Sequence, residues 1–206
     1  MRQCLLSKFD WREQMSIDIP QPSMALNSLD APGKHYRMWN SWEIPATENI
    51  DHIFDWTACV ASGAPGGRLH SIVINCHGIY NNLTRSGQGG FGLALGTGIR
   101  RADTSQFRKL RGKVSMIWIT ACGTARITTP GTSGDGDGNL FCSEIARNSG
   151  AYVVAATTLQ YHDTFLGTNR IDDFEGLTLR YNPAGAVDWS QDYGQGLING
   201  LINGWN

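Results

Sequence analysis

The chain has 206 residues, of which 41% are hydrophobic and 17% are charged, and its formal net charge is −1. This length suits one domain with a sizeable core, and the near-neutral charge gives no reason to expect a nucleic-acid partner. No apolar run reaches the ~20 residues of a membrane helix, so no membrane partner is expected either. Arg100, Arg101 and the basic residues of 108–111 are interpreted as a solvated helix face, with a polyanion site as the weaker alternative.

The cysteines and the N-terminus bear on the compartment. Five cysteines, an odd number without CxxC spacing, indicate reduced thiols. The first residues lack an apolar segment long enough for a secretory signal. We therefore expect a cytoplasmic protein, or one exported without a cleaved signal peptide.

Three structural segments are predicted in the first third of the chain. Residues 1–35 contain three prolines and little periodicity, so we expect an irregular N-terminal arm there. Bulky and polar residues alternate over 35–44, which predicts a strand that Pro45 ends. Apolar residues at helical spacing after Thr47 predict an N-capped helix that reaches about Ala61.

Apolar runs then alternate with helical segments. Nearly continuous apolar runs predict strands buried in a parallel sheet at 69–76, 114–120 and 151–157. Helices are predicted between them at 102–110 and 139–148, the second stopped by Gly150. A strand–turn–strand unit follows at 176–189, with its turn at 182–185. The alternation predicts an α/β layered sandwich.

Two of the predicted strands end in a reactive side chain followed by glycine. The first is followed by His77 and Gly78, and the second leads to Cys122 and Gly123. Sites in parallel α/β sheets form beyond the carboxyl ends of the strands, so we expect the imidazole and the thiol to share one rim. A cysteine thiolate can attack a carbonyl group while a nearby imidazole protonates the leaving group. The N–H groups of Gly78 and Cys122 are candidate oxyanion donors.

This order of motifs resembles clan CD cysteine peptidases, which include caspases, metacaspases, gingipain and clostripain relatives, and the CHAT (separase-like) group. The resemblance covers residues 69–165, and the strand at 151–157 with the residues after it is most similar to CHAT domains. It implies a three-layer α/β/α sandwich with a mostly parallel central sheet. It also implies a single caspase-like peptidase domain over 1–206 that needs no cofactor.

The resemblance further implies peptide-bond hydrolysis through an acyl-enzyme. It assigns Cys122 as the nucleophile, His77 as the general acid/base and Gly78 as the oxyanion donor. The caspase pentapeptide is only partly present, because Thr120 replaces Gln and Gly123 directly follows the cysteine. A caspase-type arginine pocket therefore does not carry over.

Substrate preference is expected to depend on an acid near the nucleophile. In related enzymes, a pocket acid selects a basic residue before the scissile bond. Asp163, just past the fourth predicted strand, is the candidate, and Asp135 and Asp137 are alternatives. A carboxylate there forms charge-assisted hydrogen bonds with Lys or Arg of a protein or peptide substrate.

Other site chemistries fit the sequence less well. The cysteines and histidines lack the short ligand pairs of metal sites, and residues 135–146 lack the Gly and Glu that an EF-hand loop requires. A serine hydrolase would need a GxSxG elbow, which is missing. Two alternatives stay open: an inactive caspase-like binding module, and a hydrolase of non-peptide esters or amides.

Overall fold

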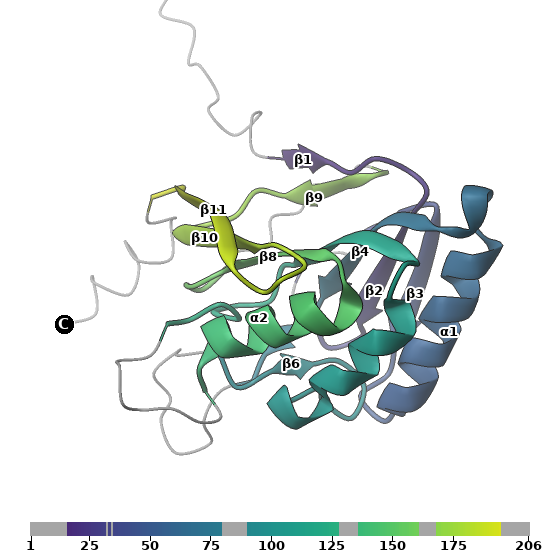
Figure 1. Ribbon diagram of the computed structural model, residues 1–206, viewed down its shortest axis with the longest axis horizontal. Helices are drawn as coiled ribbons and strands as arrows, with labels where there is room; N and C mark the ends of the chain where they lie inside the picture. Colours follow the sequence, from purple (N-terminus) through teal and green to yellow (C-terminus); the bar gives the residue numbers. More distant parts are fainter. Residues whose placement is uncertain are drawn as a thin grey trace, which may run out of the picture.

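The protein is built on a seven-stranded mixed sheet (Figure 1). The computed structural model describes residues 16–31, 33, 35–79, 90–127, 136–160 and 168–194. The strands lie in the order β11 (Val187–Asp192), β10 (Leu177–Tyr181), β8 (Tyr152–Ala156), β7 (Val114–Ile119), β4 (Leu69–Asn75), β2 (Ser23–Ser28) and β3 (Asn40–Ile44). The five strands from β3 to β8 are parallel, whereas β10 and β11 pair antiparallel. The expected α/β class is confirmed, with a sheet that is not entirely parallel.

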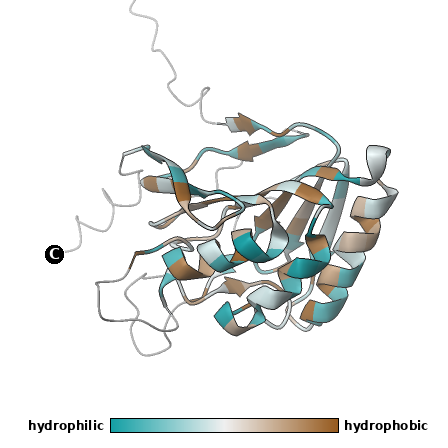
Figure 2. Ribbon diagram, viewed as in Figure 1, coloured by the Kyte–Doolittle hydropathy of each residue, from teal (hydrophilic) through white to brown (hydrophobic). Residues whose placement is uncertain are grey.

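The principal helices cover one face of this sheet. They are α1 (Ile50–Gly63), the 3₁₀ helix η3 (Arg101–Leu110) and α2 (Gly138–Ser149), and a short 3₁₀ turn, η2 (Pro65–Gly67), follows α1. Apolar side chains of α1, η3 and α2 join those of the strands in one core cluster, and Figure 2 shows apolar and polar residues alternating along these helices. Phe54 and Phe107 meet edge to face with ring centroids 4.6 Å apart, which fixes α1 against η3.

The direction in which the chain crosses the sheet explains this one-sided layer. From β3 the chain advances through β4 and β7 to β8, always towards the same edge. Parallel crossovers are right-handed, so the three helix-bearing connections fall on the same face. The connection from β2 to β3 runs the other way and supplies Tyr36 and Met38 to the opposite face.

That second face is covered by extended chain in the described residues. A two-stranded antiparallel ribbon, β1 (Ser16–Asp18) with β9 (Arg170–Asp172), packs there. Its core cluster includes Ile171 and Phe174, and Phe174 stacks on Trp118 of β7 with ring centroids 6.2 Å apart. The second helical layer of the expected three-layer sandwich is therefore not confirmed.

Strand β2 corrects the prediction of an irregular arm over residues 1–35. All six residues of β2 are buried between β3 and β4. Half of them are polar, and the side chains of Ser23 and Asn27 form hydrogen bonds with residues outside the strand. For example, the Asn27 side chain donates to Tyr36 O and accepts from Tyr36 N. The sequence did not predict this strand because it contains no apolar run. Polar side chains can nevertheless be buried without a large penalty when they are hydrogen-bonded.

The helix ends depend on local side-chain contacts. Asn49, not Thr47, caps α1, and its Oδ1 accepts a 2.7 Å hydrogen bond from Asp51 N. Gly150 ends α2 in the left-handed conformation with a φ of 66°, as predicted. None of the helices in the described ranges combines the length and hydropathy that crossing a bilayer requires.

Candidate active site

His77 and Gly78 form a short strand directly after β4. This strand, β5 (His77–Gly78), pairs antiparallel with β6 (Leu93–Ala94). Ile79 N donates to Gly92 O at 2.9 Å, which makes the pair of Gly78 and Leu93 the non-hydrogen-bonded type. The N–H of Gly78 therefore points away from β6, and the His77 side chain is exposed.

Cys122 lies in a turn directly after β7, the strand next to β4. Ile74 and Ile119 are partners in the parallel ladder, and three residues further along each strand are His77 and Cys122. The turn is held from outside the ladder: Gly123 N donates to Thr158 O at 2.6 Å, beyond the end of β8. Since that bond occupies the Gly123 N–H, this group is not available as an oxyanion donor.

The two motifs lie against each other through backbone atoms. A Cβ atom placed on Gly78 would clash with the carbonyl oxygen of Cys122 and lie only 3.2 Å from its carbonyl carbon. The sequence thus uses glycine after His77 to let the two segments approach closely. No hydrogen bond joins the His77 imidazole to the Cys122 thiol among the described residues. Catalytic hydrogen bonds are often loose without substrate and tighten when it binds.

The Cys122 thiol contacts a residue that the sequence did not identify. Gln160 N lies 3.2 Å from Cys122 Sγ and donates to it, while Gln160 O lies 3.5 Å from the same sulfur. One backbone N–H and one carbonyl oxygen of the same residue therefore hold the Cys122 side chain in a defined position. The side chain of Cys122 is half-buried, so a reagent can still reach it.

The side chain of Gln160 fixes the backbone that contacts the sulfur. Its Nε2 donates to the carbonyl oxygens of Thr158, Leu159 and Glu175 at 2.9 to 3.2 Å. Its Oε1 accepts from Glu175 N at 3.0 Å. Because the side chain is almost fully buried, these bonds lock the segment after β8 against the segment before β10.

Two other cysteines near the site are core residues. Cys76, beside His77, and Cys142 of α2 are both buried, and burial raises the pKa of each thiol. Two buried tyrosines behave in the same way: burial raises the pKa of Tyr36 and of Tyr181. These groups keep their protons at neutral pH, in agreement with the interpretation of Cys76 as a core residue.

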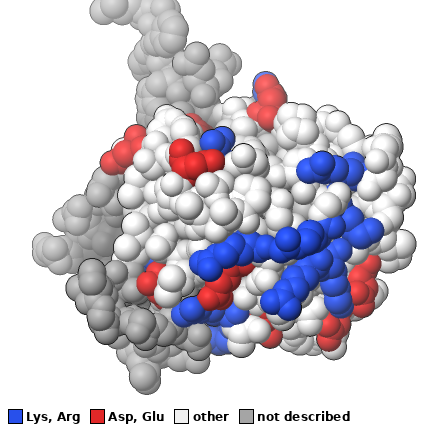
Figure 3. All heavy atoms as spheres, in the orientation of Figure 1, with Lys and Arg blue, Asp and Glu red and all other residues white. Residues whose placement is uncertain are grey.

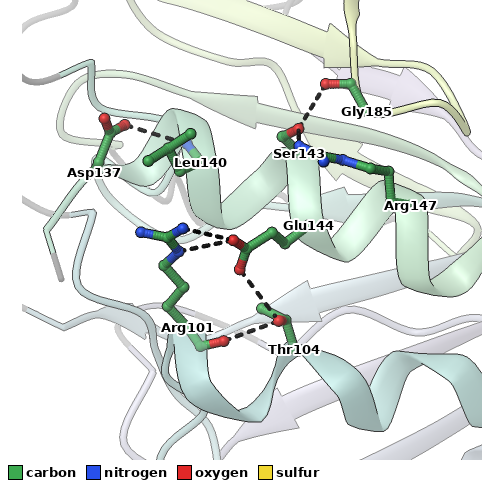
Figure 4. Close-up of polar contacts among 8 residues, drawn as sticks. All are labelled: Arg101, Thr104, Asp137, Leu140, Ser143, Glu144, Arg147 and Gly185. Carbon is green, nitrogen blue, oxygen red and sulfur yellow. Dashed lines mark hydrogen bonds and ion pairs between the residues drawn. The ribbon is translucent and has the colours of Figure 1, made fainter. Parts of the chain in front are cut away.

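Helix α2 supports the turn that carries Cys122. A Cβ on Gly138 would lie 2.6 Å from Arg126 N, so the start of the helix lies directly against the end of this turn. Asp137 caps the helix by accepting a 3.2 Å hydrogen bond from Leu140 N (Figure 4). The structure therefore gives one alternative pocket acid a capping role. Asp163 and Asp135 lie outside the described residues.

Polar contacts tie α2 to its neighbours on both sides (Figure 4). Arg101 of η3 reaches Glu144 of α2 through Nε at 2.9 Å and a terminal nitrogen at 2.7 Å. Ser143 donates to Gly185 O at 2.7 Å in the turn between β10 and β11. Helix α2 is therefore held against both η3 and the antiparallel edge of the sheet.

Comparison of the chain with protein-family models, curated proteins and solved structures found no match in any of the three. In the described part of the chain, no group of three or more His, Cys, Asp or Glu residues is placed to hold a metal ion. The case for a site therefore depends on local geometry: His77 and Cys122 follow neighbouring strand ends, and Gly78 lies against the backbone of Cys122.

Proposed function

We propose that the protein is a cysteine endopeptidase in which Cys122 is the nucleophile and His77 the general acid/base. The observation that supports this most directly is the close approach of Gly78 to the Cys122 backbone, with the thiol beside a backbone N–H donor. A caspase-like three-layer arrangement is part of the proposal. It is supported by the parallel strands and by the helical layer over one face.

The proposed reaction uses the residues in two half-reactions. His77 takes the proton of the Cys122 thiol, and the sulfur attacks the peptide carbonyl carbon. The N–H of Gly78 stabilises the oxyanion, and His77 then protonates the amine that leaves as the C–N bond breaks. Water, deprotonated by His77, attacks the thioester and releases the carboxylic acid and the free thiol.

The role of Gln160 in this proposal is to position the nucleophile. Its backbone N–H contacts the sulfur, and its buried side chain prevents this donor from moving away. Asp163 is proposed to select a basic residue before the scissile bond, by pairing with its cation. Replacement of Asp163 by Asn is then expected to abolish the preference for Arg and Lys without removing Cys122 reactivity.

Cleavage of a proteome-derived peptide library, read by mass spectrometry of new termini, tests the proposal. Wild type is expected to generate termini after a shared residue type, and Cys122→Ala to generate none. His77→Ala should slow cleavage by roughly 10²–10⁴-fold. Cys59→Ala is the matched control, because Cys59 is a free, exposed cysteine on α1.

Three results would contradict the peptidase proposal. Cleavage that persists in Cys122→Ala would exclude this nucleophile. Absence of cleavage in wild type, with no selective alkylation of Cys122, would favour the inactive binding module. Turnover of small esters or amides that depends on Cys122, without any peptide cleavage, would favour the non-peptide hydrolase.

A further inference from the structure

Positive side chains gather along one face of the molecule, over η3 and α2 (Figure 3). We define the basic stripe as four residues from the end of η3, the start of β7 and the last turn of α2: Arg108, Arg111, Lys113 and Arg147. The three arginines are exposed and the lysine is half-buried. The stripe is thus a positively charged surface on a chain whose net charge is −1.

The internal partners of the stripe are neutral. Arg108 Nε donates to Asn148 Oδ1 at 3.0 Å, and Arg111 Nε donates to Asn148 O at 3.2 Å. Arg147 donates to Ser143 Oγ at 2.6 Å, and the Lys113 ammonium donates to a serine hydroxyl of α1. Within the described residues, no carboxylate forms an ion pair with any of these four cations.

Two basic residues of η3 outside the stripe are neutralised. Lys109 lies 2.7 Å from Asp55 and 3.3 Å from Asp51, and Arg101 pairs with Glu144. These ion pairs flank the stripe with carboxylates. Within η3, the uncompensated charge is therefore limited to Arg108.

The stripe lies at the opposite end of the sheet from the candidate active site. Lys113 comes directly before β7, and its carbonyl accepts from Leu69 N at the start of β4. His77 and Cys122 follow the carboxyl ends of these same two strands. A partner on the stripe leaves the candidate active site open, so this inference does not depend on the proposed function.

We propose that the basic stripe binds a short acidic segment of a partner protein. A guanidinium has five N–H donors, and the internal contacts of each arginine use one or two of them. The remaining donors match carboxylates in bidentate geometry. Four uncompensated cations suit a segment with a few Asp or Glu residues.

A nucleic acid fits this surface less well. A protein that follows a phosphate backbone neutralises many phosphates at once, about 6–10 in strongly salt-dependent complexes. The stripe offers four, and a long polyanion continuing past it would meet the flanking carboxylates of Asp51, Asp55 and Glu144. The limited length of the stripe therefore favours a short acidic peptide.

Fluorescence anisotropy with a labelled peptide of about eight alternating Asp and Glu residues tests the proposal. Wild type should bind it, and raising NaCl from about 50 to about 300 mM should weaken binding because the contacts are exposed charges. Arg108→Gln should weaken binding about 2- to 5-fold, and Arg108→Glu more. Arg37→Gln is the matched control, since Arg37 is an exposed arginine beside Glu43, away from the stripe.

Variants at the other arginines separate charge from folding. Arg111 donates to a backbone oxygen at the end of α2, and Arg147 in the last turn donates to Ser143 one turn earlier. A Gln substitution would remove both the positive charge and these contacts. Arg111→Lys and Arg147→Lys keep the positive charge. The Lys variants keep the charge but lose the bidentate donors, so they should weaken binding less than Arg108→Glu does if they fold as wild type does by circular dichroism. Equal binding by wild type and Arg108→Glu would overturn the proposal. Tighter binding of a labelled oligothymidylate than of the acidic peptide would overturn the class of partner.

Discussion

Replacement of Gly78 by alanine probes the contact between the two halves of the candidate active site. The added methyl group would clash with Cys122 O and lie 3.2 Å from its carbonyl carbon, whereas carbon atoms in contact normally stay 3.5–4.0 Å apart. Both partners are backbone atoms, so no side-chain rotation relieves the overlap. The segments must separate by roughly 1 Å to relieve the clash with the oxygen, and such overpacking costs about 1–3 kcal/mol of unfolding free energy.

The same displacement should impair catalysis. A shift of about 1 Å between catalytic groups can cost about 10²-fold in rate, so peptide cleavage should fall by about that factor. Urea denaturation measures the stability loss, and cleavage of a fluorogenic peptide identified from the library measures the rate. Gly63→Ala is the control, because Gly63 ends α1 with no atom within 4 Å of an added Cβ. If Gly78→Ala matches wild type in both assays, Gly78 does not lie against the backbone of Cys122 as described.

Two further predictions concern the thiol and the buried ionisable groups. Gln160→Leu removes the hydrogen bonds that hold the backbone of this residue beside Cys122, so alkylation of Cys122 at neutral pH should slow about 3- to 10-fold. Gln191→Leu is the control, because Gln191 is exposed. Equal alkylation rates in the two variants would contradict the role of Gln160. Burial raises the pKa of two cysteines and two tyrosines, so above about pH 8.5 the unfolded chain loses protons that the folded chain keeps. Unfolding free energy should therefore fall with rising pH, by up to about 1.4 kcal/mol per pH unit for each group, and urea midpoints that do not decrease between about pH 8 and about pH 10.5 would refute this.

Hydrophobic pattern and capping chemistry were sufficient to locate most of the parallel sheet and its helices. The apolar runs predicted at 69–76, 114–120 and 151–157 correspond to β4, β7 and β8 with ends that differ by one residue. These strands are buried on both faces, so nearly every position is apolar. The predicted turn at 182–185 is likewise found between β10 and β11.

Elements whose burial depends on distant polar partners were not predictable in this way. Strand β2 is half polar, and Ser23 Oγ accepts a hydrogen bond from Ser71 N, which only the folded chain brings close. The strand expected at 35–44 begins at Asn40, because the residues before it turn to cover the second face of the sheet.

In the candidate site too, features that depend on neighbouring residues in sequence were predictable, and contacts between distant residues were not. The order of motifs placed His77 and Cys122 after two strands, and the structure confirms that these strands are neighbours. Gln160 gave no such signal, because its contact with Cys122 depends on the turn after β8. The catalytic roles of the pair, and the selective role of Asp163, stay predictions.

The position of β2 also has a consequence for how the chain folds. It is the first strand of the seven-stranded sheet in sequence, but it lies in the interior and pairs with β3 and β4, with Ser23 opposite Ser71. Pairing over such sequence separations is slow, whereas the β10–β11 hairpin closes over a short turn. During synthesis, the edge of β2 that pairs with β4 must therefore keep its hydrogen-bonding groups unpaired until β4 has left the ribosome.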